Sequence, residues 1–229
     1  MSNAAKQNAA SRALEREIRD GMILGVGTGS TTAYFIQALG RRVQKEHLKI
    51  TCIPSSIQTQ RLCAKAGLKL AALVEEPHLD VTIDGADEID SNLDLIKGGG
   101  GALTREKIIA SASRRLAIIA DDTKLVKKLG ERHPIPVEVL PFALGYVETQ
   151  LRKLRPRKLS LRMRGQRKDG PMITDNGNLI LDITVRALKN PKRTSTELDA
   201  ISGVVENGIF AGMTDVVYLG KAKSVRTLR

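Results

Sequence analysis

Short apolar runs alternate with segments of helical periodicity over the first half of the chain, and this alternation limits the folds available to it. The apolar run Met22–Val26 is of strand length, and Phe35, Ile36 and Leu39 follow it in helical register. Similar spacing predicts strands over 48–53, 68–73, 81–83 and 116–120, and helices over 10–18, 57–66 and 103–113. Such alternation is typical of a mostly parallel sheet covered by helices on both faces.

The pattern changes after residue 134. The Asn176-Gly177 pair separates the apolar runs 172–174 and 179–183, which predicts a hairpin. The capping-box spacing of Thr194 and Glu197 predicts a helix start. We expect the last runs, 216–219 and 225–228, to return to the first sheet. The sequence therefore predicts an α/β fold in two parts: a Rossmann-like domain over 1–129 and 208–229, and a smaller α+β domain over 130–207.

Composition places the chain among globular proteins of the cytoplasm. Its 229 residues are enough to bury a sizeable core, with 41% hydrophobic and 27% charged residues. No apolar run reaches signal-peptide or membrane-spanning length. Cys52 and Cys63 match no metal-ligand spacing, and we expect two free thiols in a reducing compartment.

The positive charge is concentrated in one stretch. The net charge is +12, and nine basic residues with no acidic one lie between Arg152 and Lys168. Within this basic run, residues 159–164 alternate apolar and polar as a half-buried strand does, so we expect the charges to line its solvated face. Aromatic residues make up only 3% of the chain and leave few platforms for stacking bases, so we expect no nucleic-acid partner.

The loop GVGTGSTT at 25–32 joins the first strand to its helix. Ser30 stands where a dinucleotide fingerprint requires glycine, and the lysine of a P-loop is absent. A loop of small residues that opens a helix can hold a phosphate monoester through its N–H groups and hydroxyls. A plain tight turn fits the same residues.

The loop DGADEID at 84–90 follows the apolar run 81–83 and holds four carboxylates. They are compatible with a divalent metal site, with a solvated acidic turn, or with acceptors for sugar hydroxyls. The alternating Asp and the final Glu of a calcium loop are missing, which makes metal the least favoured of the three.

The segment KGGGGALTREK at 97–107 combines four glycines with a flanking cation and carboxylate. Glycine allows a backbone to approach a ligand closely. Glu106 is expected about one turn inside a helix that starts near Leu103. A carboxylate beside the ammonium of Lys97 suits removal of a proton next to a carbonyl, with the cation stabilising the enolate. The alternative is a glutamate that only stabilises its own helix start.

Six motifs occur in a fixed order: GVGTGSTT, DGADEID, KGGGGALTREKI, ADDTK at 120–124, HPIPVEV at 133–139 and ITDNGN at 173–178. Together they resemble the A-type ribose-5-phosphate isomerase family, from the first helix to Leu219. The resemblance implies interconversion of D-ribose 5-phosphate and D-ribulose 5-phosphate through a cis-enediol(ate), in the non-oxidative pentose phosphate pathway. It further implies no metal or organic cofactor, and a cytoplasmic homo-oligomer, with a dimer favoured over a tetramer.

The resemblance also assigns roles to residues. Glu106 is the catalytic base, Asp84 assists ring opening or moves the hydroxyl proton, and Lys97 stabilises the enediolate. The implied substrate contacts are Thr28, Gly29, Ser30, Thr31, Asp84, Gly85, Ala86, Asp87, Lys97, Gly98, Gly99, Gly100 and Lys124. Among them, Asp87 is expected to hold hydroxyls, and the first loop and Lys124 remain for the phosphate or the far end of the sugar.

Two other classes share features with this pattern. A coenzyme A transferase also uses a glutamate near glycines, as a nucleophile, but normally needs a longer chain. A sugar-phosphate sensor carries a helix-turn-helix domain before its sugar-binding part, whereas only about twenty residues precede the first loop here. A sensor would also be favoured if Glu106 were absent, but Glu106 is present. We therefore expect the isomerase.

Overall fold

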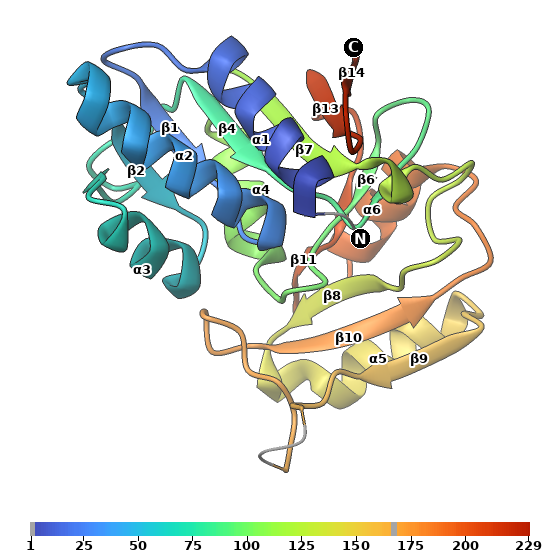
Figure 1. The fold of residues 1–229 in the computed structure, drawn as a ribbon. Helices are drawn as coiled ribbons and strands as arrows, with labels where there is room; N and C mark the ends of the chain where they lie inside the picture. The colour runs from blue at the N-terminus through green and yellow to red at the C-terminus, as the bar shows by residue number, and fades with distance from the viewer. Residues whose placement is uncertain (1–2, 166–168) are drawn as a thin grey trace. The chain divides into compact units, whose positions relative to one another are not determined.

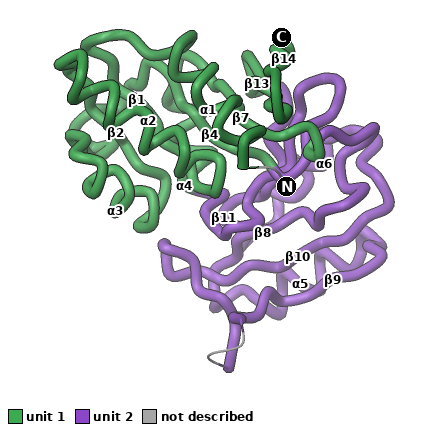
Figure 2. The backbone as a smooth tube through the Cα atoms, in the orientation of Figure 1, with its two compact units in different colours: residues 1–86, 105–124, 213–229 green, residues 87–104, 125–212 purple. Residues whose placement is uncertain are grey.

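The computed structural model describes residues 3–165 and 169–229, which form two compact units (Figure 2). The first unit comprises residues 1–86, 105–124 and 213–229, and the second comprises 87–104 and 125–212. The expected boundaries placed 87–104 with the first part of the chain. Strands in that segment pair with one another and with 209–210, which ties it to the second unit.

The first unit is built on a seven-stranded sheet of order β14-β13-β7-β4-β1-β2-β3. Its strands are β1 (Ile23–Val26), β2 (Thr51–Pro54), β3 (Lys69–Leu70), β4 (Val81–Asp84), β7 (Leu116–Asp121), β13 (Val216–Gly220) and β14 (Val225–Leu228). All neighbours are parallel except β13 and β14, which are antiparallel. The predictions of a mostly parallel sheet and of a return by the last two strands are confirmed.

Helices cover both faces of this sheet (Figure 1). They are α1 (Asn3–Glu17), α2 (Ser30–Glu46), α3 (Ile57–Lys65) and α4 (Leu103–Ser111). Successive residues of β2 point to opposite faces: Cys52 packs in one core cluster with Ala9 and Phe35, and Ile53 packs with Ile109 in another. No described helix has the length and apolar character needed to cross a membrane.

The strand order reverses at β1. The chain passes from β1 to β2 and β3 on one side and then returns to β4 on the other. Val26 is therefore in register with Pro54 on one neighbour and with Ile83 on the other. In open parallel sheets, ligands bind in the crevice outside the carboxyl ends of the strands at such a reversal. The loops after β1 and β4 begin at this point.

The second unit has a four-stranded antiparallel sheet of order β11-β8-β10-β9 and a three-stranded sheet of order β12-β6-β5. Its elements are β5 (Glu88–Ile89), β6 (Leu95–Ile96), β8 (Ile135–Val139), η2 (Pro141–Ala143), α5 (Leu144–Lys153), β9 (Lys158–Leu161), β10 (Leu179–Thr184), α6 (Pro191–Asp199), β11 (Val204–Asn207) and β12 (Ile209–Phe210). Val137, Leu151 and Leu198 lie in its separate core. This smaller sheet with its helices confirms the α+β part of the expected fold.

Helix α6 begins earlier than the capping box predicted. The side chain of Asn190 accepts a hydrogen bond from the Arg193 amide at 3.0 Å, and Pro191 occupies the first turn. The helix therefore starts at Pro191, and the predicted start at Thr194 is wrong. Glu197 instead pairs with Arg193 one turn before it. Asparagine followed by proline was the stronger start signal, because the side chain caps the helix and the proline fits its first turn.

The predicted hairpin is present only as its turn. The Thr174 amide donates to the Asn178 carbonyl and the Gly177 amide to the Thr174 carbonyl, each at 2.9 Å. Residues 172–174 form no strand, and β10 pairs with β8 and β9 instead. The amide of Met172 donates to the carbonyl of Arg162, the residue just after β9, which keeps this segment off the edge of β10.

Candidate active site

Gly27 lies in the loop after β1, directly against the end of β4. Its amide donates to the Ile83 carbonyl at 2.9 Å. A Cβ atom at this position would overlap the carboxyl group of Asp84, which is 1% exposed. The glycine therefore lets a buried carboxylate lie against the backbone of the first loop.

The hydroxyl of Thr28 belongs to a cluster of hydroxyls inside the first unit. It lies 2.8 Å from the hydroxyls of Ser55 and Ser56 and 3.1 Å from that of Thr59. Thr59 also donates to the carbonyl of Gly27 at 2.9 Å, and Ser56 caps α3. The side chain of Thr28 thus anchors the loop to the end of β2. None of these three partners was predicted from the sequence, although they follow β2, the strand beside β1.

The start of α2 carries positive electrostatic character. Gly29 is its N-cap with φ at 144°, and no side chain caps the helix. The ammonium of Lys6, from α1, donates to the hydroxyl of Ser30 at 2.7 Å. Uncapped first-turn amides beside an ammonium attract an anion. Lys6 was not predicted, because only the packing of α1 on α2 brings it to the loop.

Three neighbouring parallel strands of the first unit end in predicted site residues. Residues 28–31 follow β1, Asp84 ends β4, and Lys124 lies in the short helix η1 (Asp122–Lys124) after β7. The Gly85 amide donates to Asp84 Oδ1 at 2.7 Å, and Gly85 and Ala86 are half-buried. These residues thus lie at the carboxyl ends of adjacent parallel strands, where open sheets of this kind bind their ligands.

Glu106 lies in the first turn of α4, as the spacing from Leu103 predicted. The residue is only 3% exposed. Three residues further along α4, Ile109 packs with Ile53 and Leu79 in the core of the first unit. Packing of α4 on the core of the first unit thus fixes the position of the buried Glu106 carboxylate. At the start of a helix the dipole favours a negative charge.

Asp87 fastens the glycine-rich loop within the second unit. Its Oδ2 accepts a hydrogen bond from the Gly99 amide at 2.7 Å, and its own amide donates to the Ile96 carbonyl at 2.8 Å. A Cβ at Gly99 would lie 2.9 Å from Asp87 Oδ1. The carboxylate that was expected to meet sugar hydroxyls therefore also orders the loop.

The four glycines make different demands on the loop. A Cβ at Gly98 would crowd Leu103 and Pro136, at 2.7 and 2.9 Å, and one at Gly101 would overlap Met172. Gly98 and Gly101 also have positive φ angles of 96° and 80°. Only at Gly100 is there no atom within 4 Å of an added Cβ. Packing within the chain therefore accounts for Gly98 and Gly101, and Gly100 has open space beside it. That Gly98, Gly99 and Gly100 contact a ligand stays a prediction.

Lys97 is a buried cation at the start of this loop. It is 3% exposed, and its Nζ lies 5.5 Å from the centre of the Phe210 ring. Its amide donates to the Gly208 carbonyl at 2.9 Å, which fixes the backbone where β6 ends. An ammonium over an aromatic face gains a stabilising cation–π interaction. Phe210 was not predicted, because it comes from a strand more than a hundred residues later.

Arg162 braces the glycine-rich loop from the basic run. Its Nη1 donates to the carbonyls of Gly98 and Gly99, at 2.8 and 3.3 Å. Its Nε donates to Asp182 at 2.7 Å, and a second bond reaches the other carboxylate oxygen. The side chain is 14% exposed. The expectation of a solvated face away from the motifs is therefore wrong at Arg162; residues 166–168 of the run lie outside the described residues.

We expect Arg162→Lys to weaken this bracing. Lysine keeps the charge but lacks the planar fork that reaches Asp182 and both carbonyls. The variant should lose about 1–3 kcal/mol of unfolding free energy, measured by urea denaturation, and several-fold in kcat/KM. Arg157→Lys, at an exposed position of the same run, is the control and should change the unfolding free energy by less than about 0.5 kcal/mol. Equal effects of the two substitutions would contradict the bracing role.

The other two carboxylates of 84–90, Glu88 and Asp90, also bind backbone amides. Glu88 is fully buried and accepts three amide hydrogen bonds of 2.6 Å, from Gly130, Arg132 and His133. Burial raises the pKa of Asp90, which accepts from the amides of residues 92 and 94. The segment is therefore no solvated acidic turn. Among the described residues, no three His, Cys, Asp or Glu side chains are grouped to hold a metal ion.

A buried glutamate explains two of the later motifs. Glu138, in β8, accepts from the hydroxyl of Thr104 at 2.6 Å through one oxygen. Its other oxygen accepts from Thr174, Asn176 and Asn178 at 2.9, 3.0 and 2.8 Å. Glu138 thus connects the turn of ITDNGN to the first turn of α4, the helix that carries the predicted base.

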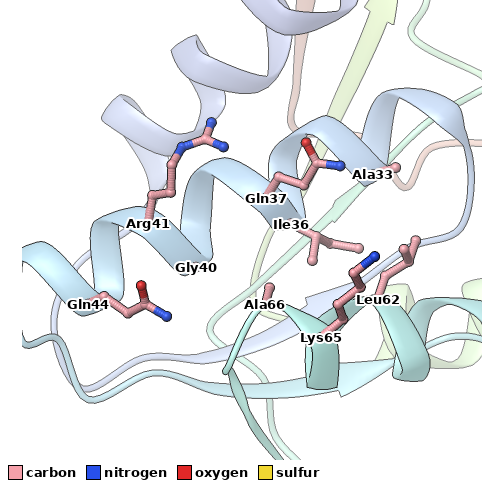
Figure 3. A pocket seen from close by; sticks show the side chains of 9 residues that line it. All are labelled: Ala33, Ile36, Gln37, Gly40, Arg41, Gln44, Leu62, Lys65 and Ala66. Carbon is pink, nitrogen blue, oxygen red and sulfur yellow. The ribbon is translucent and has the colours of Figure 1, made fainter.

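The first unit also has a groove of about 340 Å³ between α2 and α3 (Figure 3). It is lined by Ala33, Ile36, Gln37, Gly40, Arg41, Gln44, Leu62, Lys65 and Ala66. A Cβ at Gly40 would lie 2.6 Å from the Ala66 carbonyl, so a glycine there lets the two helices pack closely. The groove contains none of the predicted site residues.

Comparison with known proteins agrees with the motifs. The profile of the family "Ribose 5-phosphate isomerase A (phosphoriboisomerase A)" matches residues 51–224. The chain is 46% identical to ribose-5-phosphate isomerase A of Methanothermobacter thermautotrophicus, over 98% of this chain and 97% of the relative. It is 47% identical to that of Archaeoglobus fulgidus over the full length of both.

Solved structures show the same likeness. The ribose 5-phosphate isomerase A of Methanocaldococcus jannaschii superposes with a TM-score of 0.93 at 42% identity, over 98% of both chains. A D-ribose-5-phosphate isomerase in complex with phospho-erythronic acid superposes with a TM-score of 0.96 at 42% identity, over the full length of both. The fold, the ordered motifs and these matches agree, and the chain belongs to the ribose 5-phosphate isomerase A family.

Proposed function

We propose that the chain carries out the reaction of its family with Glu106 as the catalytic base. That reaction is the aldose–ketose isomerisation of D-ribose 5-phosphate and D-ribulose 5-phosphate, a step of the non-oxidative pentose phosphate pathway. The observation that supports the assignment best is the burial of Glu106, at 3% exposure, in the first turn of α4. A desolvated carboxylate at a fixed position is suited to proton transfer at carbon.

In this mechanism Glu106 takes the proton from C2 of the open-chain aldose, and the C–H electrons form the C1–C2 double bond as the carbonyl oxygen becomes negative. Lys97, itself 3% exposed, offsets that charge. Asp84 moves the hydroxyl proton between O2 and O1, and Glu106 returns its proton to C1 to give the ketose. Asp84 is 1% exposed and fixed against Gly27, which suits a group that must hold one geometry.

The remaining contacts divide by chemistry. We assign the phosphate to the uncapped start of α2, where the amides, the hydroxyls of Ser30 and Thr31 and the ammonium of Lys6 attract an anion. Lys124 supplies a further cation for the far end of the substrate. In the second unit, Asp87 and the open backbone at Gly100 are assigned to the sugar hydroxyls.

The proposed reaction needs no metal ion, because the ammonium of Lys97 offsets the negative charge on the enediolate oxygen. We expect purified protein to convert ribose 5-phosphate to the ketose at the same rate before and after dialysis against EDTA. Ketose formation is followed continuously, and a zinc-dependent enzyme treated in parallel is the control for the chelator. Activity lost to EDTA and restored by zinc or manganese would contradict the assignment of Lys97, and no ketose at all would contradict the function.

We also propose a cytoplasmic location and a homo-oligomeric state, with a dimer favoured over a tetramer and no nucleic-acid partner. Two free, buried cysteines suit a reducing compartment. Six aromatic residues in the whole chain, three Phe and three Tyr, offer little surface for stacking bases.

A further inference from the structure

The groove between α2 and α3 has an apolar floor. Its volume is about 340 Å³, within the range of about 300–1,000 Å³ that is usual for small-molecule sites. Ile36 is buried, and Ala33, Leu62 and Ala66 are half-buried, so aliphatic carbon lines the space between the two helices. Covering such a surface with the apolar part of a ligand is favourable, because it removes both from water.

Polar side chains line the same groove, and none of them is acidic. Helix α2 contributes Gln37, Arg41 and Gln44, and α3 contributes Lys65; all four are exposed. In Figure 3 the ammonium of Lys65 and the amide of Gln44 point into the space between the helices. The amide nitrogen of Gln44 would lie 3.3 Å from a Cβ at Gly67, just beyond α3, so this side chain extends from one helix toward the other.

The two cations of the groove are not neutralised by the chain. In the part of the chain that the structure describes, no ion pair or side-chain hydrogen bond involves Arg41 or Lys65, and the nearby Glu46 pairs with Arg42 instead. Cations in a cleft without carboxylates attract an anion. The amides of the two glutamines can donate and accept hydrogen bonds. The groove is therefore complementary to a small organic anion with an apolar body.

Both helices of the groove start at the loop to which we assign the substrate phosphate. Helix α2 begins at Ser30, and the side chain of Ser56 caps α3. The hydroxyl of Thr28 lies 2.8 Å from that of Ser56 and 3.1 Å from that of Thr59, in the first turn of α3. These hydrogen bonds hold the loop to α3, so a molecule that contacts both helices also stabilises the loop.

We propose that the groove binds a small organic anion with an apolar body and a phosphate or carboxylate group, and that this ligand strengthens the binding of ribose 5-phosphate. The body covers Ile36 and Leu62, and the anionic group pairs with Lys65. Such a ligand joins α2 to α3 and favours the arrangement in which Thr28 is bonded to α3, which pre-organises the loop for phosphate. The effect on ribose 5-phosphate rests on the proposed function, whereas binding in the groove does not.

The first test measures binding of 1-naphthyl phosphate, a probe with a flat apolar body and one phosphate. The chain has no tryptophan, so the fluorescence polarisation of the naphthyl group can be followed with little protein background. Binding should be saturable, with a Kd of about 1 mM or lower for a molecule of this size. 1-Naphthol and inorganic phosphate each carry half of the probe, and each should bind at least about tenfold more weakly.

Two variants locate the bound probe. Lys65→Glu reverses the charge on the α3 side and should weaken binding at least about tenfold, and Gln37→Glu adds a carboxylate on the α2 side with little change of shape and should weaken it several-fold. Lys45→Glu is the control, because Lys45 and Lys65 are both exposed in the last turns of their helices but Lys45 does not line the groove. It should leave the Kd within about twofold of wild type. Thermal unfolding verifies that all three variants are folded.

The second test measures the KM for ribose 5-phosphate with and without a saturating amount of the probe. The probe should lower KM about fivefold in the wild-type protein and in Lys45→Glu, and should lose this effect in Lys65→Glu. A raised KM would place the probe in the substrate's own phosphate site. That result, the absence of saturable binding, or binding that both groove variants leave unchanged would overturn the inference, and an unchanged KM would overturn the effect on the substrate. If no ketose forms, the proposed function fails, while the polarisation measurement still tests the groove.

Discussion

Glu106→Gln should lower kcat by about 10²–10⁴-fold while KM changes little. Glutamine keeps the size and hydrogen-bonding reach of the buried side chain but has no basicity, and a general base contributes about 3–5 kcal/mol to lowering the barrier. The groups assigned to bind the substrate are unchanged, so the loss should fall on kcat. Steady-state kinetics of ketose formation measure both constants.

The matched control for this prediction is Glu131→Gln, the same substitution at an exposed position. It should leave kcat within about twofold of wild type. Thermal unfolding of both variants shows whether the lost turnover comes from chemistry or from folding. A folded Glu106→Gln protein with near-normal turnover would remove Glu106 from the mechanism.

Gly27→Ala is expected to lower both the unfolding free energy and kcat/KM, with the largest loss of activity after that of Glu106→Gln. The added methyl group overlaps the carboxyl group of Asp84, which is 1% exposed. Overpacking of this kind costs about 1–3 kcal/mol of unfolding free energy. If Asp84 moves the hydroxyl proton as proposed, displacing its carboxylate by about 1 Å should also lower kcat/KM about 100-fold. Gly165→Ala, at a glycine with open space around it, is the control and should change the unfolding free energy by less than about 0.5 kcal/mol.

A double variant separates the clash from other effects of the alanine. In an Asp84→Ala background the overlapping carboxyl group is gone, so Gly27→Ala should then cost little stability. Activity should stay low in the double variant, because Asp84 itself is missing. An equal stability cost of Gly27→Ala in both backgrounds would show that the methyl group meets something other than Asp84.

Local sequence signals predicted much of the fold and the position of Glu106 in it. The start of α4, and with it the place of Glu106, follows from the glycines before Leu103 and the helical register after it. The return of β13 and β14 to the first sheet also matched the apolar runs. Each of these features depends on patterns within a few residues, which a sequence displays directly.

The features that were missed depend on contacts between distant residues. Arg162 reaches the carbonyls of Gly98 and Gly99 from more than sixty positions away, and Lys6 reaches Ser30 through helix packing. The alternating pattern of the basic run is the same whether all of its charged side chains face solvent or one of them, such as Arg162, turns inward. The pattern alone therefore could not show that Arg162 is buried. The acidic loop was ambiguous for the same reason, because only the fold shows that Glu88 binds three backbone amides.

The central claim, that Glu106 carries the proton between C2 and C1, is tested most directly by isomerisation in deuterated water. A proton held on a carboxylate exchanges with solvent whenever the site opens, so NMR of the product made by the wild-type protein should show deuterium at C1 of ribulose 5-phosphate. The Glu106→Gln protein should give neither label nor product over the same time. Label entering C1 at the wild-type rate in the Glu106→Gln protein would contradict the account.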